Sequence, residues 1–331
     1  MIMGLPEKLK LAKDAGRSEI FLSLARVKES GRLFLGASDG KVYDIDLLAE
    51  KPEFKSWEGH SSYVTGLALA GDTLVSGSYD GKLIWRDITS GEIKRTIDGH
   101  QRWIRKLAIS PDGKRFASVA DDMLCRIWDL ETGKQIHELT GHEVRTPNHF
   151  HSMLYTVAFS PTGQHLATAD RVGRICIWDA STGSKVNTIE APGFYTWDPK
   201  QRIHSIGGIR SVAFSPDGTK IVVGGIGHIG NIDHLDGPSS VEIFAWEKAE
   251  KLHEFLGDAK GLVETLAFGP DGNWVIGAGG DNGGFVQFYD LEAKKVARSE
   301  KVPMHVHALT LNETADKLFG CGHGKAAVWE L

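Results

Sequence analysis

One stretch of the chain, IGHIGNIDHLDGPSS at residues 226–240, gathers side chains that could bind a metal ion. Its candidate ligands are His228, Asp233, His234 and Asp236. Zinc sites use imidazole and carboxylate groups, but they favour shorter and more regular spacings. Calcium loops place acidic residues at alternating positions with a closing glutamate, which this stretch lacks. We expect a polar loop shaped by glycine and proline; an ion on these four residues stays open as the alternative.

One further catalytic motif is absent from the sequence. The chain has no G-x-x-x-x-G-K-[ST] of phosphate-binding loops. Its three cysteines, Cys125, Cys176 and Cys321, are too few and too scattered for a disulfide framework. Cys125 and Cys176 lie in apolar runs, where cysteine acts as a small hydrophobic residue. We predict no catalytic residue, no cofactor and no enzymatic activity.

Charge and hydropathy exclude two classes of partner. The 331 residues carry a net charge of −5, and no run of Lys or Arg occurs. A nucleic-acid binder needs a basic patch to displace counterions from phosphates, so we expect no nucleic-acid partner. No apolar segment reaches the length of about 18 residues that a membrane span requires, so we expect no membrane partner. With so few cysteines, we predict a cytoplasmic protein.

The elements that position any site are repeated along the chain. Residues 99–138 and 152–189 both read as four short strands, joined by the turns SPDG or SPTG and then ETGK or STGS. Proline presets one backbone angle of such turns, and glycine accepts the positive φ that they require. The unit recurs about every 40 residues, with longer intervals before the fourth and fifth copies. Seven copies end at an acidic residue: Asp46, Asp87, Asp129, Asp179, Glu247, Asp290 and Glu330.

The Gly-His and Trp-Asp pairs of these copies resemble the WD-repeat family, and the chain is similar to its prokaryotic single-domain members. The resemblance spans nearly the whole chain. It implies one all-β domain over residues 1–331, a seven-bladed β-propeller of four-stranded antiparallel blades. The last copy ends one strand short, and the alternating stretch at 7–13 suits the missing outer strand. We expect this N-terminal strand to pair in the last blade and close the ring, because closure removes an open sheet edge.

The resemblance also implies a buried hydrogen-bond network of histidine, Ser or Thr, aspartate and tryptophan within a blade. Such a network is structural, because a fully satisfied set of buried polar groups stiffens its surroundings. In the second copy Arg86 takes the tryptophan position, and in the fourth a longer turn leaves the set incomplete. The residues assigned to it are His60, Ser76, Asp80, His100, Ser118, Asp122, Trp128, His142 and Trp178.

Long connections are predicted on one face of the ring, at residues 143–152, 191–208 and 226–240. Insertions on one face of a repeat protein often mark its binding face. Aromatic residues and arginine dominate protein-binding hot spots. Four aromatic residues lie in these loops: Phe150, Phe194, Tyr195 and Trp197. Alignment of the first strands places a second group near the mouth of the central channel: Tyr63, Trp103, Arg105, Tyr155, Arg210, Glu264, His305 and His307.

These features favour a non-catalytic scaffold that binds a peptide or protein on the face with the long loops and the channel mouth. The alternative is a metal-dependent enzyme or a small-molecule binder that uses the His- and Asp-rich loops of the fourth and fifth blades. A third interpretation makes the chain a subunit of a larger complex. The fold alone does not choose among these functions.

Overall fold

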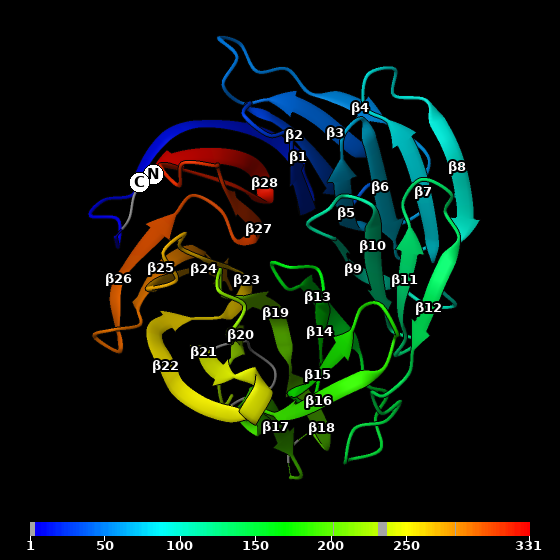
Figure 1. Cartoon of the computed structure of the whole chain (residues 1–331). Coiled ribbons are helices and arrows are strands. Elements are labelled where there is room, and N and C mark those ends of the chain that lie inside the picture. The colour runs from blue at the N-terminus through cyan, green and yellow to red at the C-terminus, as the bar shows by residue number, and fades with distance from the viewer. Residues whose placement is uncertain (1–3, 201, 231–236, 282) are drawn as a thin grey trace.

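The computed structural model describes residues 4–200, 202–230, 237–281 and 283–331. Antiparallel sheets stand around a central axis in a ring, as Figure 1 shows. The fold is therefore the all-β propeller that the repeats predicted. The described residues include two short 3-10 helices, η1 (Pro192–Phe194) and η2 (Trp246–Lys248). No helix in the described part of the chain has the length and apolarity needed to cross a bilayer.

Five sheets have four strands each, paired in chain order. They comprise β5 (Val64–Ala70), β6 (Thr73–Ser78), β7 (Lys82–Asp87) and β8 (Ile93–Asp98); β9 (Ile104–Ile109), β10 (Arg115–Ala120), β11 (Cys125–Asp129) and β12 (Gln135–Leu139); β13 (Leu154–Phe159), β14 (His165–Asp170), β15 (Arg174–Asp179) and β16 (Lys185–Glu190); β19 (Ile209–Phe214), β20 (Lys220–Ile226), β21 (Pro238–Ala245) and β22 (Glu250–Lys260); and β23 (Leu262–Phe268), β24 (Trp274–Gly280), β25 (Gly284–Asp290) and β26 (Lys295–Val302). Each sheet is named below by its first and last strand.

The sixth large sheet joins the two ends of the chain (Figure 1). Its strands, in order of pairing, are β27 (Val306–Leu311), β28 (Lys317–Glu330), β1 (Lys10–Arg26), β2 (Arg32–Ala37), β3 (Val42–Asp46) and β4 (Lys55–Trp57). The first part of β1 pairs with the end of β28, and its second part pairs with β2. Because β1 and β28 run unbroken from one partner to the next, the sheets of blade size number six in the described chain, rather than the predicted seven.

The pairing of β1 with β28 begins later in the chain than predicted. Lys10 lies opposite Glu330, and Gly16 lies opposite Lys325. The N-terminal strand thus pairs over residues 10–16 instead of 7–13. The alternation of KLKLAK does not fix this boundary, because it continues on both sides of Lys10.

Each innermost strand contains a β-bulge, which lies near the start of the strand in all of them except β1, where it follows Phe21. In β9, Ile104 lies opposite Ala120 and Lys106 lies opposite Val119, so Arg105 has no opposite residue. A bulge of this kind bends the strand and redirects the side chain of the extra residue. The residues passed over in this way are Leu22 in β1, Thr65 in β5, Arg105 in β9, Tyr155 in β13, Arg210 in β19, Glu264 in β23 and His307 in β27.

Neighbouring sheets pack face to face and bury the hydrophobic core between them. Between β13–β16 and β19–β22, for example, Ile177, Phe214 and Trp246 belong to one buried cluster. The innermost strands also contact one another around the axis, from β1 to β5, β9, β13, β19, β23 and β27 and back to β1. The core is therefore divided among the gaps between sheets, and the axis is left to a channel.

The SPDG-type turns take the geometry that their residues predict. Gly113 has a φ of 68°, and its amide donates to the Ser110 carbonyl at 2.9 Å. The Ser110 hydroxyl bonds the Asp112 carboxylate at 2.6 Å, and it accepts from the Arg115 amide at 2.9 Å. These local bonds fix the connection between β9 and β10, so the loops on this face stay short.

The long connection at 191–208 is more ordered than a loop. It contains η1 and a two-stranded hairpin of β17 (Tyr195–Asp198) and β18 (His204–Gly207). Phe194 was predicted to bind a partner, but its side chain is fully buried. It packs in the cluster of Ile209 and Val223, so that prediction is wrong. An apolar ring beside a strand-forming segment gains more free energy in the core than at the surface.

Hydrogen exchange tests the pairing of β1 with β28. We expect about every second amide of Lys10–Gly16 to exchange much more slowly than an unpaired amide, because an outer strand bonds its single neighbour through alternate residues. The amide of Glu53, which lies outside any strand, gives the unprotected reference. Rates near the reference throughout Lys10–Gly16 would contradict this pairing.

Candidate functional site

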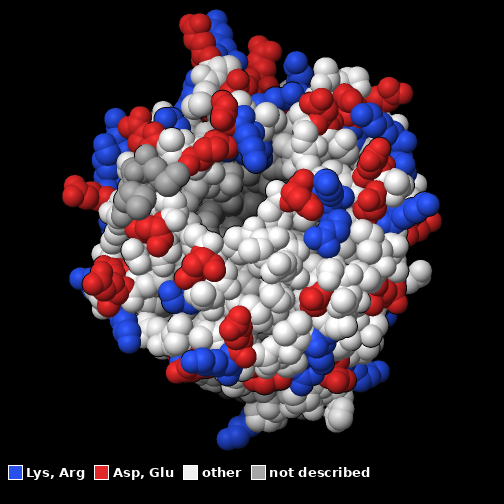
Figure 2. All heavy atoms as spheres, in the orientation of Figure 1, with Lys and Arg blue, Asp and Glu red and all other residues white. Residues whose placement is uncertain are grey.

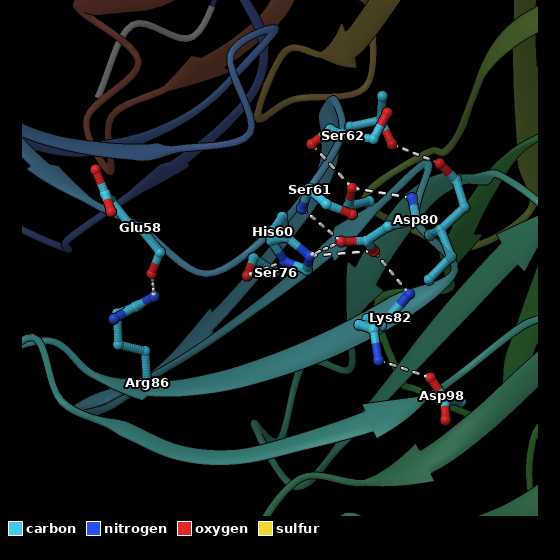
Figure 3. A network of polar contacts seen from close by, with 12 residues as sticks. Glu58, His60, Ser61, Ser62, Ser76, Asp80, Lys82, Arg86 and Asp98 are labelled. Carbon is cyan, nitrogen blue, oxygen red and sulfur yellow. Dashed lines mark hydrogen bonds and ion pairs between the residues drawn. The ribbon is translucent and has the colours of Figure 1, made fainter.

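Three histidines join neighbouring segments through polar networks inside the blades. In β5–β8, the His60 Nδ1 lies 3.0 Å from the Asp80 carboxylate, and its Nε2 lies 2.8 Å from the Ser76 hydroxyl (Figure 3). Asp80 also accepts from the amides of Ser61 at 3.0 Å and Lys82 at 2.9 Å. The network therefore ties the loop before β5 to the hairpin between β6 and β7.

The network in β9–β12 includes a tryptophan. The His100 Nδ1 lies 3.0 Å from Asp122, and its Nε2 lies 2.7 Å from the Ser118 hydroxyl. The indole of Trp128 donates to the same hydroxyl at 2.8 Å. In β5–β8 the equivalent strand position holds Arg86, which donates instead to the Glu58 carbonyl (Figure 3). It also donates to the Gly91 carbonyl. Ser76 therefore lacks the indole donor that Ser118 has.

The network in β13–β16 is complete, although the sequence indicated only His142 and Trp178. The His142 Nδ1 lies 2.8 Å from Asp170, and its Nε2 lies 2.8 Å from the Thr168 hydroxyl. Trp178 donates to that hydroxyl at 2.9 Å. Sequence reasoning missed Thr168 and Asp170 because the aspartate follows the hydroxyl residue by two positions here, instead of four. The matching signal was the triplet TAD at the end of the second strand.

The same contacts give the buried groups different pKa values. Burial raises the pKa of the Asp80 carboxyl, but donors from His60, Ser61 and Lys82 outweigh it and lower this pKa to about 2. Burial dominates at His100 and lowers its pKa despite Asp122. At His142 burial acts in the same direction, but Asp170 outweighs it and raises the pKa to about 9. Two histidines in equivalent places thus have pKa values that are shifted in opposite directions.

A cavity of about 280 Å³ lies on the axis of the ring. Figure 2 shows one face of the molecule, hollowed at the centre, with charged side chains of both signs around the hollow. All seven bulge residues line the cavity: Leu22, Thr65, Arg105, Tyr155, Arg210, Glu264 and His307. The bulges therefore direct one side chain from each innermost strand into a common space. Leu22 and Thr65 were not predicted, because neither residue type suggests a contact with a ligand.

Three aromatic rings form a stack beside the cavity. The Tyr79 and Trp103 rings are parallel within 3°, with centroids 4.5 Å apart. Tyr63 stacks on the other side of Tyr79 at 5.5 Å. Trp103 is 50% exposed and Tyr63 is 47% exposed, although rings of this size are usually covered. Sequence analysis predicted Tyr63 and Trp103 as contact residues but missed Tyr79, whose ring stacks with both of them.

Arg105 fixes the aromatic stack in place. Its Nε and Nη2 donate to the Asp121 carboxylate at 2.8 and 2.6 Å, and its Nη1 donates to the Tyr79 hydroxyl. Burial lowers the pKa of Arg105, but Asp121 and the nearby tyrosines outweigh it, so the pKa is raised. The guanidinium also lies 4.9 Å from the centre of the Tyr79 ring. Arg105 therefore positions the stack, and most of its donors are already engaged.

The guanidinium of Arg210 is less engaged in hydrogen bonds within the protein than that of Arg105. Its guanidinium carbon lies 3.8 Å above the centre of the Tyr155 ring. Its Nε is buried and has no hydrogen-bond partner among the described residues. Lys106 lines the same cavity, where burial lowers the pKa of its ammonium group. An unpartnered guanidinium on an aromatic ring is suited to accept a carboxylate from a ligand.

The aromatic residues of the long loops form a separate cluster. Phe150 lies 5.8 Å from Trp197 and 4.8 Å from His204, measured between ring centroids. The Tyr195 hydroxyl donates to the Asn148 side chain at 2.8 Å. These contacts tie residues 143–152 to the β17–β18 hairpin, and all three aromatic rings are partly buried. They stabilise the loops and leave only part of each ring for a partner.

The structure describes one of the four candidate metal ligands of the 226–240 loop. His228 is exposed. Asp233, His234 and Asp236 lie outside the described residues. Among the described histidines, His305, His307 and His323 lie close together, and the rings of His305 and His307 stack at 4.6 Å beside Glu264.

Comparison with known proteins identifies the family. The family model described as "WD domain, G-beta repeat" matches residues 51–87, 91–129, 133–179, 198–228 and 249–290, which is more than half of the chain. The chain therefore belongs to the WD-repeat family.

Individual relatives share parts of the sequence. Nuclear distribution protein PAC1-2 of Uncinocarpus reesii is 40% identical over 85 residues, which are 25% of this chain and 18% of the relative. Small ribosomal subunit protein RACK1 of Schizosaccharomyces pombe is 26% identical over 270 residues, which are 72% of this chain and 81% of the relative. Apoptotic protease-activating factor 1 of Rattus norvegicus is 32% identical over 34% of this chain.

The matches to PAC1-2 and to the apoptotic factor cover less than a fifth of those proteins. Similarity to them therefore supports the repeat, and the functions of the whole proteins are not carried over. The similarity to prokaryotic members stays a prediction.

The networks predict unequal effects of two serine substitutions. Ser118→Ala leaves the buried indole of Trp128 and the Nε2 of His100 without a partner. Each loss costs about 1–3 kcal/mol, so we expect urea unfolding to show a decrease of at least about 2 kcal/mol. Ser76→Ala affects His60 alone, and its effect should be about half as large. The exposed Ser90→Ala is the control, and equal effects of the two buried substitutions would contradict this account.

The low pKa of Asp80 predicts a pH dependence of stability. Folding favours the charged carboxylate, so its contribution is complete above the ordinary aspartate pKa and is lost as pH falls toward about 2. Asp80→Asn should lower the free energy of unfolding at neutral pH and flatten its decrease between about pH 5 and pH 2. The variant Asp258→Asn, which alters an exposed carboxyl, provides the baseline. Parallel profiles for wild type and Asp80→Asn would be inconsistent with the network.

Proposed function

We propose that this protein is a scaffold that binds a segment of a partner protein at the channel mouth. The observation that carries the proposal is the half-exposed stack of Tyr63, Tyr79 and Trp103 beside a cavity with an unpartnered guanidinium. Aromatic rings and arginine supply most of the affinity in protein interfaces. A partner would lay an apolar or cationic side chain on the stack and place an acidic side chain near Arg210.

The rigidity of the mouth supports this function. Arg105 holds Tyr79 through its hydroxyl, and Asp121 holds Arg105 through two hydrogen bonds. His60 and Asp80 fix the loop that leads to Tyr63. A surface that keeps its conformation loses little entropy on binding, which raises affinity without adding contacts.

We also infer that the ring consists of seven blades, with two of them fused in the six-stranded sheet. Seven innermost strands contact one another in sequence, and each has one bulge residue in the cavity. Within β28, Gly324 has a φ of 69°, and the Leu331 amide donates to the Asp316 carbonyl at 3.0 Å. An equivalent backbone hydrogen bond is found in an ordinary four-stranded blade. There the Leu130 amide, just after β11, donates to the Lys114 carbonyl, just before β10. Residues 317–330 therefore act as a hairpin, and residues 10–16 supply the outer strand of its blade.

A role within a larger assembly is a narrower form of the proposal. The relative that matches over 81% of its own length is named as a protein of the small ribosomal subunit. The alternative of a metal-dependent enzyme on the 226–240 loop has no contact in its favour among the described residues of that loop. Binding of a protein segment is therefore the function that the geometry supports best.

Peptide selection against the full chain tests the proposal. Peptides chosen from a random displayed library would be measured by fluorescence anisotropy against wild type and Tyr63→Ala/Trp103→Ala. Because truncation of a hot-spot residue costs about 2 kcal/mol or more, we expect affinity to fall at least about 30-fold. Val186→Ala/Leu256→Ala removes exposed apolar side chains of the outer strands β16 and β22 and should keep wild-type affinity.

Two results would count against this site. One is equal binding of the selected peptides by the wild type and the aromatic variant. The other is a loss of affinity in the outer-strand control, which would move the interface to the rim. The variant Arg210→Ala then distinguishes the role of Arg210 from that of the aromatic stack. It should weaken the binding of only those peptides that contain an acidic residue.

A further inference from the structure

Three histidines and one glutamate converge on the wall of the channel. Glu264 and His307 are the bulge residues of the neighbouring strands β23 and β27. His305 directly precedes β27 on the same face, and His323 lies in the hairpin of β28. The ring centroids of the histidines are 4.6, 4.9 and 5.0 Å apart. The bulges therefore place four potential metal ligands together from three strands.

One nitrogen atom in each of two of these rings makes no hydrogen bond among the described residues. The Nε2 atoms of His305 and His307 are buried and have no hydrogen-bond partner among the described residues. The His305 side chain is 90% buried, and the Glu264 carboxylate oxygen lies 4.0 Å from its Nε2. An unpaired buried polar atom costs free energy, so two of them beside a carboxylate point to an absent bound species.

The Nδ1 atom of His305 makes a hydrogen bond that fixes the orientation of the Nε2 atom. Its Nδ1 donates to the Asp281 carbonyl at 3.4 Å, which leaves the lone pair of Nε2 directed at the cluster. Metal-binding histidines usually make such a bond to a carbonyl or carboxylate. A side chain at position 280 would crowd this arrangement, because a Cβ there would lie 2.1 Å from the Gly283 carbonyl oxygen and 3.1 Å from the His305 Cγ.

We propose that Glu264, His305 and His307 bind a divalent transition-metal ion, with Zn²⁺ as the best fit, in the wall of the channel. One ligand atom from each of these residues lies within 4.8 Å of the other two. Tetrahedral zinc with bonds of 2.0–2.1 Å needs ligand atoms about 3.3 Å apart, so the side chains close by about 1.5 Å. The terminal torsions of His and Glu are broad and permit this movement.

The ligand set selects the class of ion. Two imidazoles and one carboxylate are a ligand set of zinc sites with an open position, whereas Ca²⁺ and Mg²⁺ prefer oxygen ligands alone. The fourth position faces the cavity, where the exposed His323 or a water molecule completes the coordination. This inference stands apart from the peptide site, because it uses none of the aromatic stack.

Zn²⁺ titration of the full chain by calorimetry, after treatment with a chelator, tests the proposal. We expect one ion per chain. His305→Ala/His307→Ala should weaken binding by more than about 100-fold, because even the loss of a residue that only orients a ligand costs 10–100-fold. Glu264→Gln should weaken it less. In wild type, Co²⁺ should give the visible absorption of a tetrahedral site.

The control His149→Ala/His228→Ala removes two exposed histidines of the long loops and should bind Zn²⁺ as the wild type does. Circular dichroism verifies folding, and His323→Ala with Glu264→Gln replaces the double variant if that variant unfolds. The proposal is overturned if the wild type binds no ion or if the double variant keeps wild-type affinity. It is also overturned if only the control loses binding, because the ion then lies in the loops.

Discussion

The antiparallel pairing of β1 with β28 is the constraint on which the rest of the ring depends. It joins residues near the two ends of the chain, so the last sheet along the sequence meets the first. Without it, β28 would present the backbone groups of Ala326, Ala327 and Val328 as an open edge. The other sheets are built from local hairpins, and each packs mainly against its neighbours around the ring. One long-range pairing therefore converts a row of local units into a closed frame.

The frame separates what must be rigid from what can contact a partner. Inside the blades, His60, His100 and His142 join loops to strands through bonds that are hidden from solvent. At the axis, the bulges release one side chain per innermost strand from the core. Sheets without a histidine network use other means: Ser239 and Tyr289 both donate to the buried Gln287 side chain, which links β21 to β25. The channel mouth can therefore be polar without weakening the blades behind it.

Sequence reasoning reached the fold because its signals are local. Turn residues and repeated Trp-Asp pairs report on single hairpins, and hairpins are most of this structure. It failed where residue type or spacing gave no signal. Leu22 and Thr65 were missed because neither residue type suggests a contact with a ligand, and the two-residue offset from Thr168 concealed Asp170. Phe194 was misplaced because aromatic residues serve equally in cores and interfaces. The unbroken strands β1 and β28 changed the expected sheet count for a related reason: turn residues do not show where a strand ends.

The order of the bulge residues gives the channel a polarity of its own. Around the axis the sequence is Leu22, Thr65, Arg105, Tyr155, Arg210, Glu264 and His307. Cationic and aromatic groups thus occupy one arc, and the glutamate and imidazole occupy the next, while a leucine and a threonine complete the circle. No rotation about the axis superimposes this pattern on itself. A bound chain would therefore meet seven different neighbours in a fixed order, and its direction across the mouth would be set before any contact with the outer loops.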